Sequence, residues 1–132
     1  MGKTIMVETD FRAGERLIRA LDEHNFEVRA AFWVYSESSR VWTLTIASPE
    51  YRRLGDLDAF RRFREIFDGI GIDPDELNSS DTMLVDANAP IVREVRRHTH
   101  TEPDQILSRP RGIGYFSVNM QEYDDALVYR VS

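Results

Sequence analysis

Cysteine is absent from this sequence of 132 residues. The absence excludes disulfide frameworks, zinc ribbons, thiol nucleophiles and iron–sulfur clusters together. It also fits a reducing compartment, and we expect the protein to be cytoplasmic. No apolar run approaches the roughly 18 residues that span a bilayer, and the first ten residues lack the apolar core of a signal peptide. We therefore expect no contact with a membrane.

Lysine is nearly absent. The sequence has one lysine, Lys3, and sixteen arginines. A Schiff-base lysine or a phosphate-loop lysine has to lie inside a structured site. We expect residues 1–5 to fray, which makes Lys3 a poor candidate for either role. The sequence therefore argues against both kinds of lysine chemistry.

Acidic residues outnumber basic ones by 23 to 17, which gives a formal net charge of −6. This balance argues against a protein that coats nucleic acid with its whole surface. The charge is also polarised along the chain. Residues 69–92 include five acids and no base, whereas residues 93–111 carry a surplus of arginine. An anionic partner is thereby confined to the second of these segments.

The remaining composition, with 42% hydrophobic and 11% aromatic residues, is that of a globular domain. No repeat, linker or low-complexity stretch divides the chain, so we predict a single domain over residues 1–132.

Hydrophobic periodicity and turn residues predict the order helix, strand, strand, helix, strand, helix, strand, strand. Five strands with three main helices indicate an α+β fold, a two-layer sandwich whose sheet is mostly antiparallel. The expected helices cover 11–24, 56–68 and 90–99, with a short one before Gly55, and the expected strands cover 28–35, 41–47, 83–85, 113–118 and 123–131. We expect the first two strands to pair as one hairpin and the last two to pair as a second hairpin. In the second main helix, the spacing predicts a buried face of Leu57, Phe60, Phe63, Ile66 and Phe67.

Both faces of the predicted sheet carry large apolar side chains. In the first strand, for example, Phe32 alternates with Trp33, and in the last strand we expect Leu127, Tyr129 and Val131 to share one face. A single layer of helices cannot cover both faces. Three explanations stay open: a helix crosses to the second face, another subunit covers it, or it binds a ligand. We favour an interface with a second copy or a protein partner, formed by Trp33, Tyr35, Val41, Thr43 and Thr45.

The basic segment offers a second candidate site. A helical wheel places Arg93, Arg97 and His100 on the side away from the apolar residues of the third main helix. The same cations also offset the dipole at the end of that helix, which is the simpler interpretation. The candidate anion or partner site comprises Arg93, Arg96, Arg97, His100, Arg109 and Arg111.

The pair formed by His98 and His100 is the third candidate. Residues two apart point the same way on a strand but nearly opposite ways on a helix. The pair can therefore share a metal or flank a phosphate only if the helix ends before it. We find no third ligand nearby beyond Glu102 or Asp104, and we predict no metal and no cofactor.

Three functions follow, in order of preference. The first is a non-catalytic interaction module that self-associates or binds a protein through an apolar sheet face. The second is binding of nucleic acid or a nucleotide through Arg93 to Arg111. The third is a metal-assisted phosphoesterase that uses His98 and His100.

Overall fold

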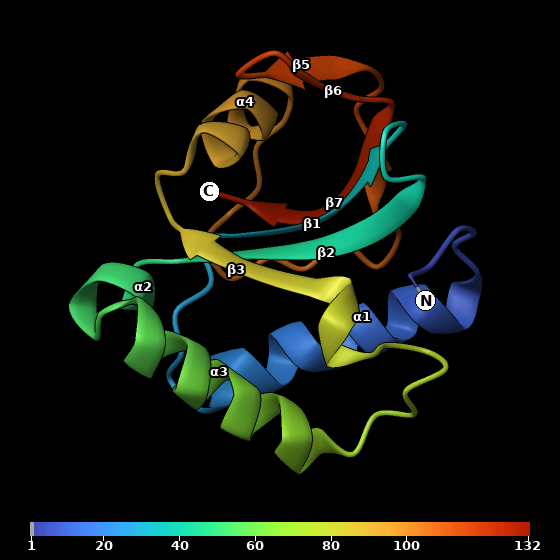
Figure 1. Ribbon diagram of the computed structural model, residues 1–132. Coiled ribbons are helices and arrows are strands. Elements are labelled where there is room, and N and C mark those ends of the chain that lie inside the picture. Colours follow the sequence, from blue (N-terminus) through green and yellow to red (C-terminus); the bar gives the residue numbers. More distant parts are fainter. Residues whose placement is uncertain (1) are drawn as a thin grey trace.

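The computed structural model describes residues 2–132 and has the α+β architecture expected from the sequence (Figure 1). Helices pack against an open, mostly antiparallel sheet with the strand order β3-β2-β1-β7-β4. In chain order the elements are α1 (Glu8–Glu23), β1 (Ala30–Ser36), β2 (Val41–Ser48), α2 (Glu50–Arg53), α3 (Asp56–Ile70), the 3-10 turn η1 (Ser79–Asp81), β3 (Thr82–Asp86), α4 (Pro90–His98), β4 (Arg111–Gly112), β5 (Phe116–Val118), β6 (Gln121–Tyr123) and β7 (Asp125–Val131). Across the described chain, none of the helices combines the length and apolarity that a membrane crossing needs.

The N-terminal residues, which we expected to fray, lie against β2; the first of them is outside the described part of the chain. Lys3 forms a β-bridge with Trp42, whose backbone N–H donates to the Lys3 carbonyl oxygen at 2.7 Å. The Lys3 ammonium also forms an ion pair with Asp10 at 2.9 Å. Asp10 accepts a hydrogen bond from the Val7 N–H at 3.0 Å. Because this bond satisfies a free N–H at the helix start, α1 begins earlier than the periodicity predicted.

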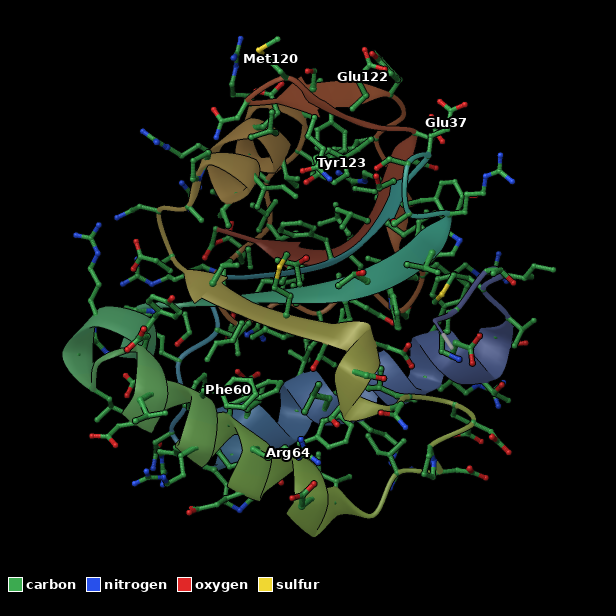
Figure 2. All side chains as sticks on the ribbon, in the orientation of Figure 1. Glu37, Phe60, Arg64, Met120, Glu122 and Tyr123 are labelled. Atoms are coloured by element: carbon green, nitrogen blue, oxygen red, sulfur yellow. The ribbon has the colours of Figure 1, made fainter. Side chains whose placement is uncertain are left out.

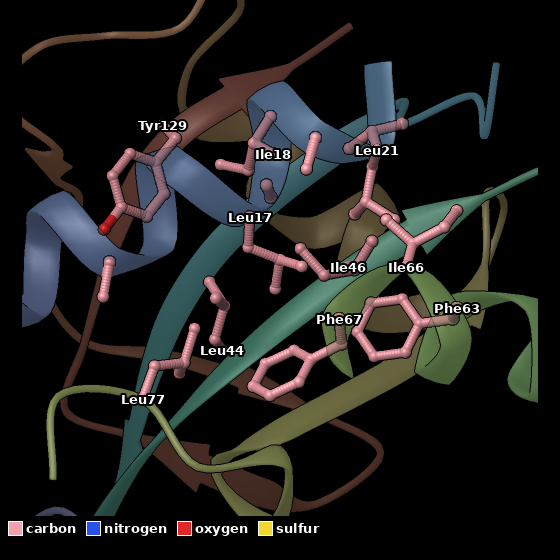
Figure 3. Packing of buried hydrophobic residues seen from close by; sticks show 14 of the residues in the cluster. Leu17, Ile18, Leu21, Leu44, Ile46, Phe63, Ile66, Phe67, Leu77 and Tyr129 are labelled. Carbon is pink, nitrogen blue, oxygen red and sulfur yellow. The ribbon is translucent and has the colours of Figure 1, made fainter. Parts of the chain in front are cut away.

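The helices α1 and α3 cover one face of the sheet (Figure 1). Apolar side chains of both helices meet those of β2 in a continuous core (Figure 3). These are Leu17, Ile18 and Leu21 from α1, Phe63, Ile66 and Phe67 from α3, and Leu44 and Ile46 from β2.

The opposite face is covered by α4 and by the β5–β6 hairpin (Figure 1). Its core comprises Ile91, Val92 and Val95 from α4, Phe116 from β5, and Ala30, Phe32, Val34 and Val128 from the sheet. Of the three explanations for two apolar sheet faces, the structure therefore shows the first, in which a helix crosses to the second face.

A β-bulge in β7 changes which side chains share a face. Ala31 pairs with Arg130 but Phe32 pairs with Val128, so Tyr129 is an extra residue in β7. The bulge turns both Tyr129 and Arg130 toward α1. Val131 consequently packs in the α4 core, and our prediction that it shares a face with Tyr129 was wrong.

The predicted second hairpin pairs differently from our expectation. The strand β5 does not pair with the last strand, β7. It pairs with β6 in a separate two-stranded sheet. The Asp125 carboxylate explains why this hairpin separates from the main sheet. One of its oxygens accepts hydrogen bonds from the backbone N–H groups of Ile113 (3.2 Å), Gly114 (2.8 Å) and Ala126 (2.8 Å). These bonds fix a sharp bend before β7, and the hairpin folds over α4 instead of joining the main sheet.

Candidate functional site

The interface predicted from the sheet pattern lies largely inside the molecule. Trp33 and Thr45 are fully buried, and the Trp33 indole N–H donates to the Tyr129 hydroxyl at 3.0 Å beneath α1. Tyr35, Val41 and Thr43 are half-buried. Trp33 lies on the face covered by α1 and α3, and Thr45, the partner of Phe32, lies on the face covered by α4. The chain's own elements cover both faces, so the assignment of Trp33 and Thr45 to an exposed interface was wrong.

The predicted basic site does not assemble at one place. Arg93 and Arg97 lie on the exposed side of α4, where a shallow groove of about 320 Å³ separates them from Ser117 and Asn119 of the hairpin. Within this groove the Arg97 guanidinium forms an ion pair with Glu94 at 3.3 Å.

The other arginines of the predicted site have structural partners or lie elsewhere. Arg96 donates to the Ser132 carbonyl oxygen at 3.1 Å, and Arg111 donates to the Thr99 hydroxyl at 2.9 Å. Arg109 lines a groove beside α1, on the opposite side of the sheet from α4. The local surplus of charge in residues 93–111 is therefore distributed over two sides of the molecule.

The histidine pair does not meet the condition stated for a shared ligand. The helix α4 includes His98, whose Nε2 lies 3.4 Å from the Glu94 carboxylate. Thr99 ends the helix with extended backbone, and His100 after it is exposed. In residues 2–132, no group of three or more histidine, aspartate or glutamate side chains is arranged to hold a metal ion.

An acidic groove of about 540 Å³ lies between the β1–β2 turn and the β5–β6 hairpin. Glu37 and Glu122 line it, and Met120 at the hairpin tip is 98% exposed (Figure 2). A hydrogen bond to Glu122 raises the pKa of the nearby Tyr115 hydroxyl, and the negative charges of Asp124 and Glu37 add to this effect. The groove is a polar surface with one protruding apolar side chain.

The outer side of α3 exposes apolar residues that the periodicity predicted to be buried. Leu57 is 68% exposed and Phe60 is 52% exposed, and Leu54 at the end of α2 is also exposed. Arg62, on the other flank of α3, donates to the His24 carbonyl oxygen at the end of α1. Phe60 therefore points away from α1, toward the side of the molecule where β3 lies (Figure 2). Leu57, three residues earlier in the helix, lies on the same exposed side of α3.

The neighbouring strand β3 is an open edge of the sheet (Figure 1). It pairs with β2 on one side, in parallel, from Leu44↔Thr82 to Ser48↔Asp86. The Thr82 N–H donates to the Ser79 carbonyl oxygen at the end of η1, and in the described chain residues 83–85 make no backbone hydrogen bond outside this ladder. The opposite edge strand, β4, is two residues long. Natural proteins shield edges with charged side chains, proline, bulges or very short strands. The strand β3, which reads Thr-Met-Leu-Val-Asp, has a charge only at its last residue, Asp86.

Paired charges surround this open edge. Arg64 contacts Asp68 at 3.1 Å, and Arg52 contacts Asp86 at 3.2 Å. The combination of an apolar centre and a neutralised polar rim is typical of protein interfaces. We call β3 together with Leu54, Leu57 and Phe60 the β3 edge surface.

The sequence held a signal for the exposed side of α3 that our interpretation missed. Leu57 and Ile66 are nine residues apart, which is two and a half turns of an α-helix. The two side chains therefore point in opposite directions and cannot share one buried face. Since Ile66 is buried, Leu57 has to face outward.

No protein-family model, curated protein or solved structure matches this chain significantly.

Proposed function

We propose that this protein is a non-catalytic interaction module that binds another polypeptide strand along the β3 edge surface. The observation that carries the proposal is the juxtaposition of an unshielded edge strand with the exposed side chains of Leu57 and Phe60. The edge supplies free backbone donors and acceptors, which give an added strand its affinity, while contacts of its side chains with the flanking residues give specificity. The apolar side chains of α2 and α3 supply the area that stabilises such a strand.

Met83 supports the same surface from the other side of the sheet. It is the second residue of β3, is 40% exposed, and shares its sheet face with Thr45, its partner in β2. An added strand therefore has apolar contacts available on both faces, with Met83 on one and Phe60 on the other. The arginine site has no comparable support, because its members do not converge.

A peptide probe tests the proposal directly. A synthetic peptide of residues 80–88 is added at millimolar concentration to the labelled protein, and the backbone amide signals of residues 82–86 are followed by NMR. We expect these signals to shift and their hydrogen exchange to slow, whereas a scrambled peptide leaves them unchanged. Equal effects of both peptides, or shifts confined to other surfaces, would contradict strand addition.

Two methionine variants provide a matched control. Met83→Lys places a solvated charge on the edge strand, and Met120→Lys places the same charge on the remote hairpin tip. Binding of the peptide should be lost in Met83→Lys and retained in Met120→Lys. The opposite pattern would move the site to the acidic groove.

A further inference from the structure

We infer that the strand that occupies the β3 edge belongs to a second copy of this chain, paired antiparallel through β3 with a two-fold axis at Leu84. This inference rests on the proposed function and adds the identity, direction and register of the partner. A two-fold contact uses the same surface on both subunits and closes after two copies. The two sheets then join into one continuous sheet with β3 and its symmetry mate at the centre.

The side chains of β3 complement themselves in this register. Met83 lies opposite Val85 of the other copy, and Leu84 lies opposite its own symmetry mate, so apolar side chains meet on both faces. Thr82, whose hydroxyl donates to the Ser79 carbonyl oxygen at 2.6 Å, lies opposite Asp86, so each carboxylate faces an uncharged side chain. A parallel, in-register pair would instead bring two Asp86 carboxylates side by side, and like charges directly opposite each other are destabilising.

The helix α3 fits the same arrangement. It packs with β2 and the inward-facing side of β3, because Phe63 and Phe67 share a core with Leu44 and with the half-buried Leu84. Joining two β3 edges therefore places the two α3 helices about two strand spacings apart, or roughly 10 Å. This separation is within the range for packed helices. Leu57 and Phe60, which face the edge, become the contact between them.

The subunit is compact enough to exist alone. Its accessible surface is 7376 Å², close to the ~7,200 Å² expected for a compact monomer of its mass. The exposed residues of the β3 edge surface therefore contribute to pairing without being required for folding. We infer a reversible dimer whose surface variants still fold.

Sedimentation equilibrium tests whether a second copy is the partner. We expect a monomer–dimer equilibrium in which Met83→Lys raises the dissociation constant at least about tenfold, because the ammonium loses its hydration at the interface. Met120→Lys should leave the constant unchanged. A wild-type protein that stays monomeric at millimolar concentration overturns the inference, although the proposed function stands if the peptide still binds. A dimer that is insensitive to Met83→Lys overturns both.

Cysteine cross-linking tests the register, and the absence of native cysteine makes it unambiguous. Under mild oxidation, a mixture of Met83→Cys and Val85→Cys should form the mixed disulfide, because positions 83 and 85 lie directly opposite each other. Each variant alone should cross-link far more slowly, since its two copies lie at the diagonal positions, roughly 7–8 Å apart. Faster cross-linking of Met83→Cys with itself would contradict the antiparallel register.

Discussion

Tyr129 connects the last strand to the first helix through its hydroxyl group. It donates to the Phe11 carbonyl oxygen at 2.6 Å and accepts the Trp33 indole N–H at 3.0 Å. This arrangement needs space at Gly14, where an added methyl group would meet the hydroxyl oxygen at 2.5 Å. The glycine is therefore required for close approach and not for backbone freedom.

Substituting Gly14 by alanine should destabilise the protein by about 1–3 kcal/mol, the usual cost of overpacking a core. Gly69 in α3 is the matched control, because a methyl group there meets nothing within 4 Å. Gly69→Ala should be neutral or stabilise by up to about 1 kcal/mol, since alanine favours helix. Urea denaturation measures both. Equal effects of the two substitutions would contradict the role of close packing at Gly14.

Tyr129 also predicts how stability depends on alkaline pH. Burial raises the pKa of its hydroxyl far above the ordinary value of about 10. Above about pH 10, the Tyr129 hydroxyl loses its proton in the unfolded chain but keeps it in the folded chain. The stability that the neutral form provides is complete below pH 10 and is lost as the pH rises further, by up to about 1.4 kcal/mol per pH unit. Burial of Tyr123 adds to the same slope.

Urea denaturation between pH 8 and 11.5 tests this prediction. Tyr129→Phe should be less stable at neutral pH, because it loses two hydrogen bonds, but its stability should decline less steeply above pH 10. An unchanged slope would show that Tyr129 does not titrate as described.

At the scale of elements, local patterns predicted most of the fold. The alternation in the first two strands gave the β1–β2 hairpin, and the proline at residue 90 with the apolar spacing after it gave α4. The bulge at Tyr129 was not predictable, because it depends on contacts of β7 with α1, over one hundred residues earlier. The separate hairpin likewise depends on the Asp125 carboxylate and its three backbone donors.

The candidate sites were less predictable than the fold. We grouped the arginines of residues 93–111 into one site because they are close together in the sequence. Their contacts in the folded chain decide which of them are free to bind a partner. Arg96 and Arg111 bond to atoms 36 and 12 residues away. The exposure of Leu57 could be predicted from helical geometry alone. The open edge at β3 could not be predicted without knowing the order of the strands in the sheet.

Two phenylalanines of α3 allow the contribution of the core to be distinguished from that of the proposed interface. Phe63 is buried and Phe60 is 52% exposed. Phe63→Ala should cost about 3–5 kcal/mol, as expected for loss of a buried aromatic side chain. Phe60→Ala should change the stability of the monomer by no more than about 0.5 kcal/mol but should weaken the dimer. Urea denaturation at low concentration, combined with sedimentation, distinguishes the two effects. Similar losses of monomer stability would place Phe60 in the core.

At the scale of the whole molecule, the net charge of −6 opposes self-association, because two copies repel each other at long range. The proposed contact itself is apolar with internally paired charges. The dimer should therefore become tighter as salt screens the repulsion. Binding of nucleic acid would show the reverse dependence, with affinity falling steeply as salt rises.

Sedimentation at 50 and 500 mM sodium chloride measures this dependence. We expect the dissociation constant of the wild-type dimer to fall at the higher salt concentration, while the constant of Met83→Lys stays at least about tenfold higher than that of the wild type at both concentrations. A dimer that dissociates as salt is added would indicate a contact made by ion pairs, and would contradict the apolar interface at β3.

The position of β7 inside the sheet has a consequence for synthesis of the protein. Tyr35 in β1 pairs with Asp125 in β7, 90 residues later. While the chain is being made, β1 can pair with β2 long before its second neighbour exists, and its other edge stays open until residue 131 has emerged. Such distant pairing slows folding. We expect the nascent chain to remain without its closed core until translation reaches β7, so that premature termination before this strand yields an unfolded product.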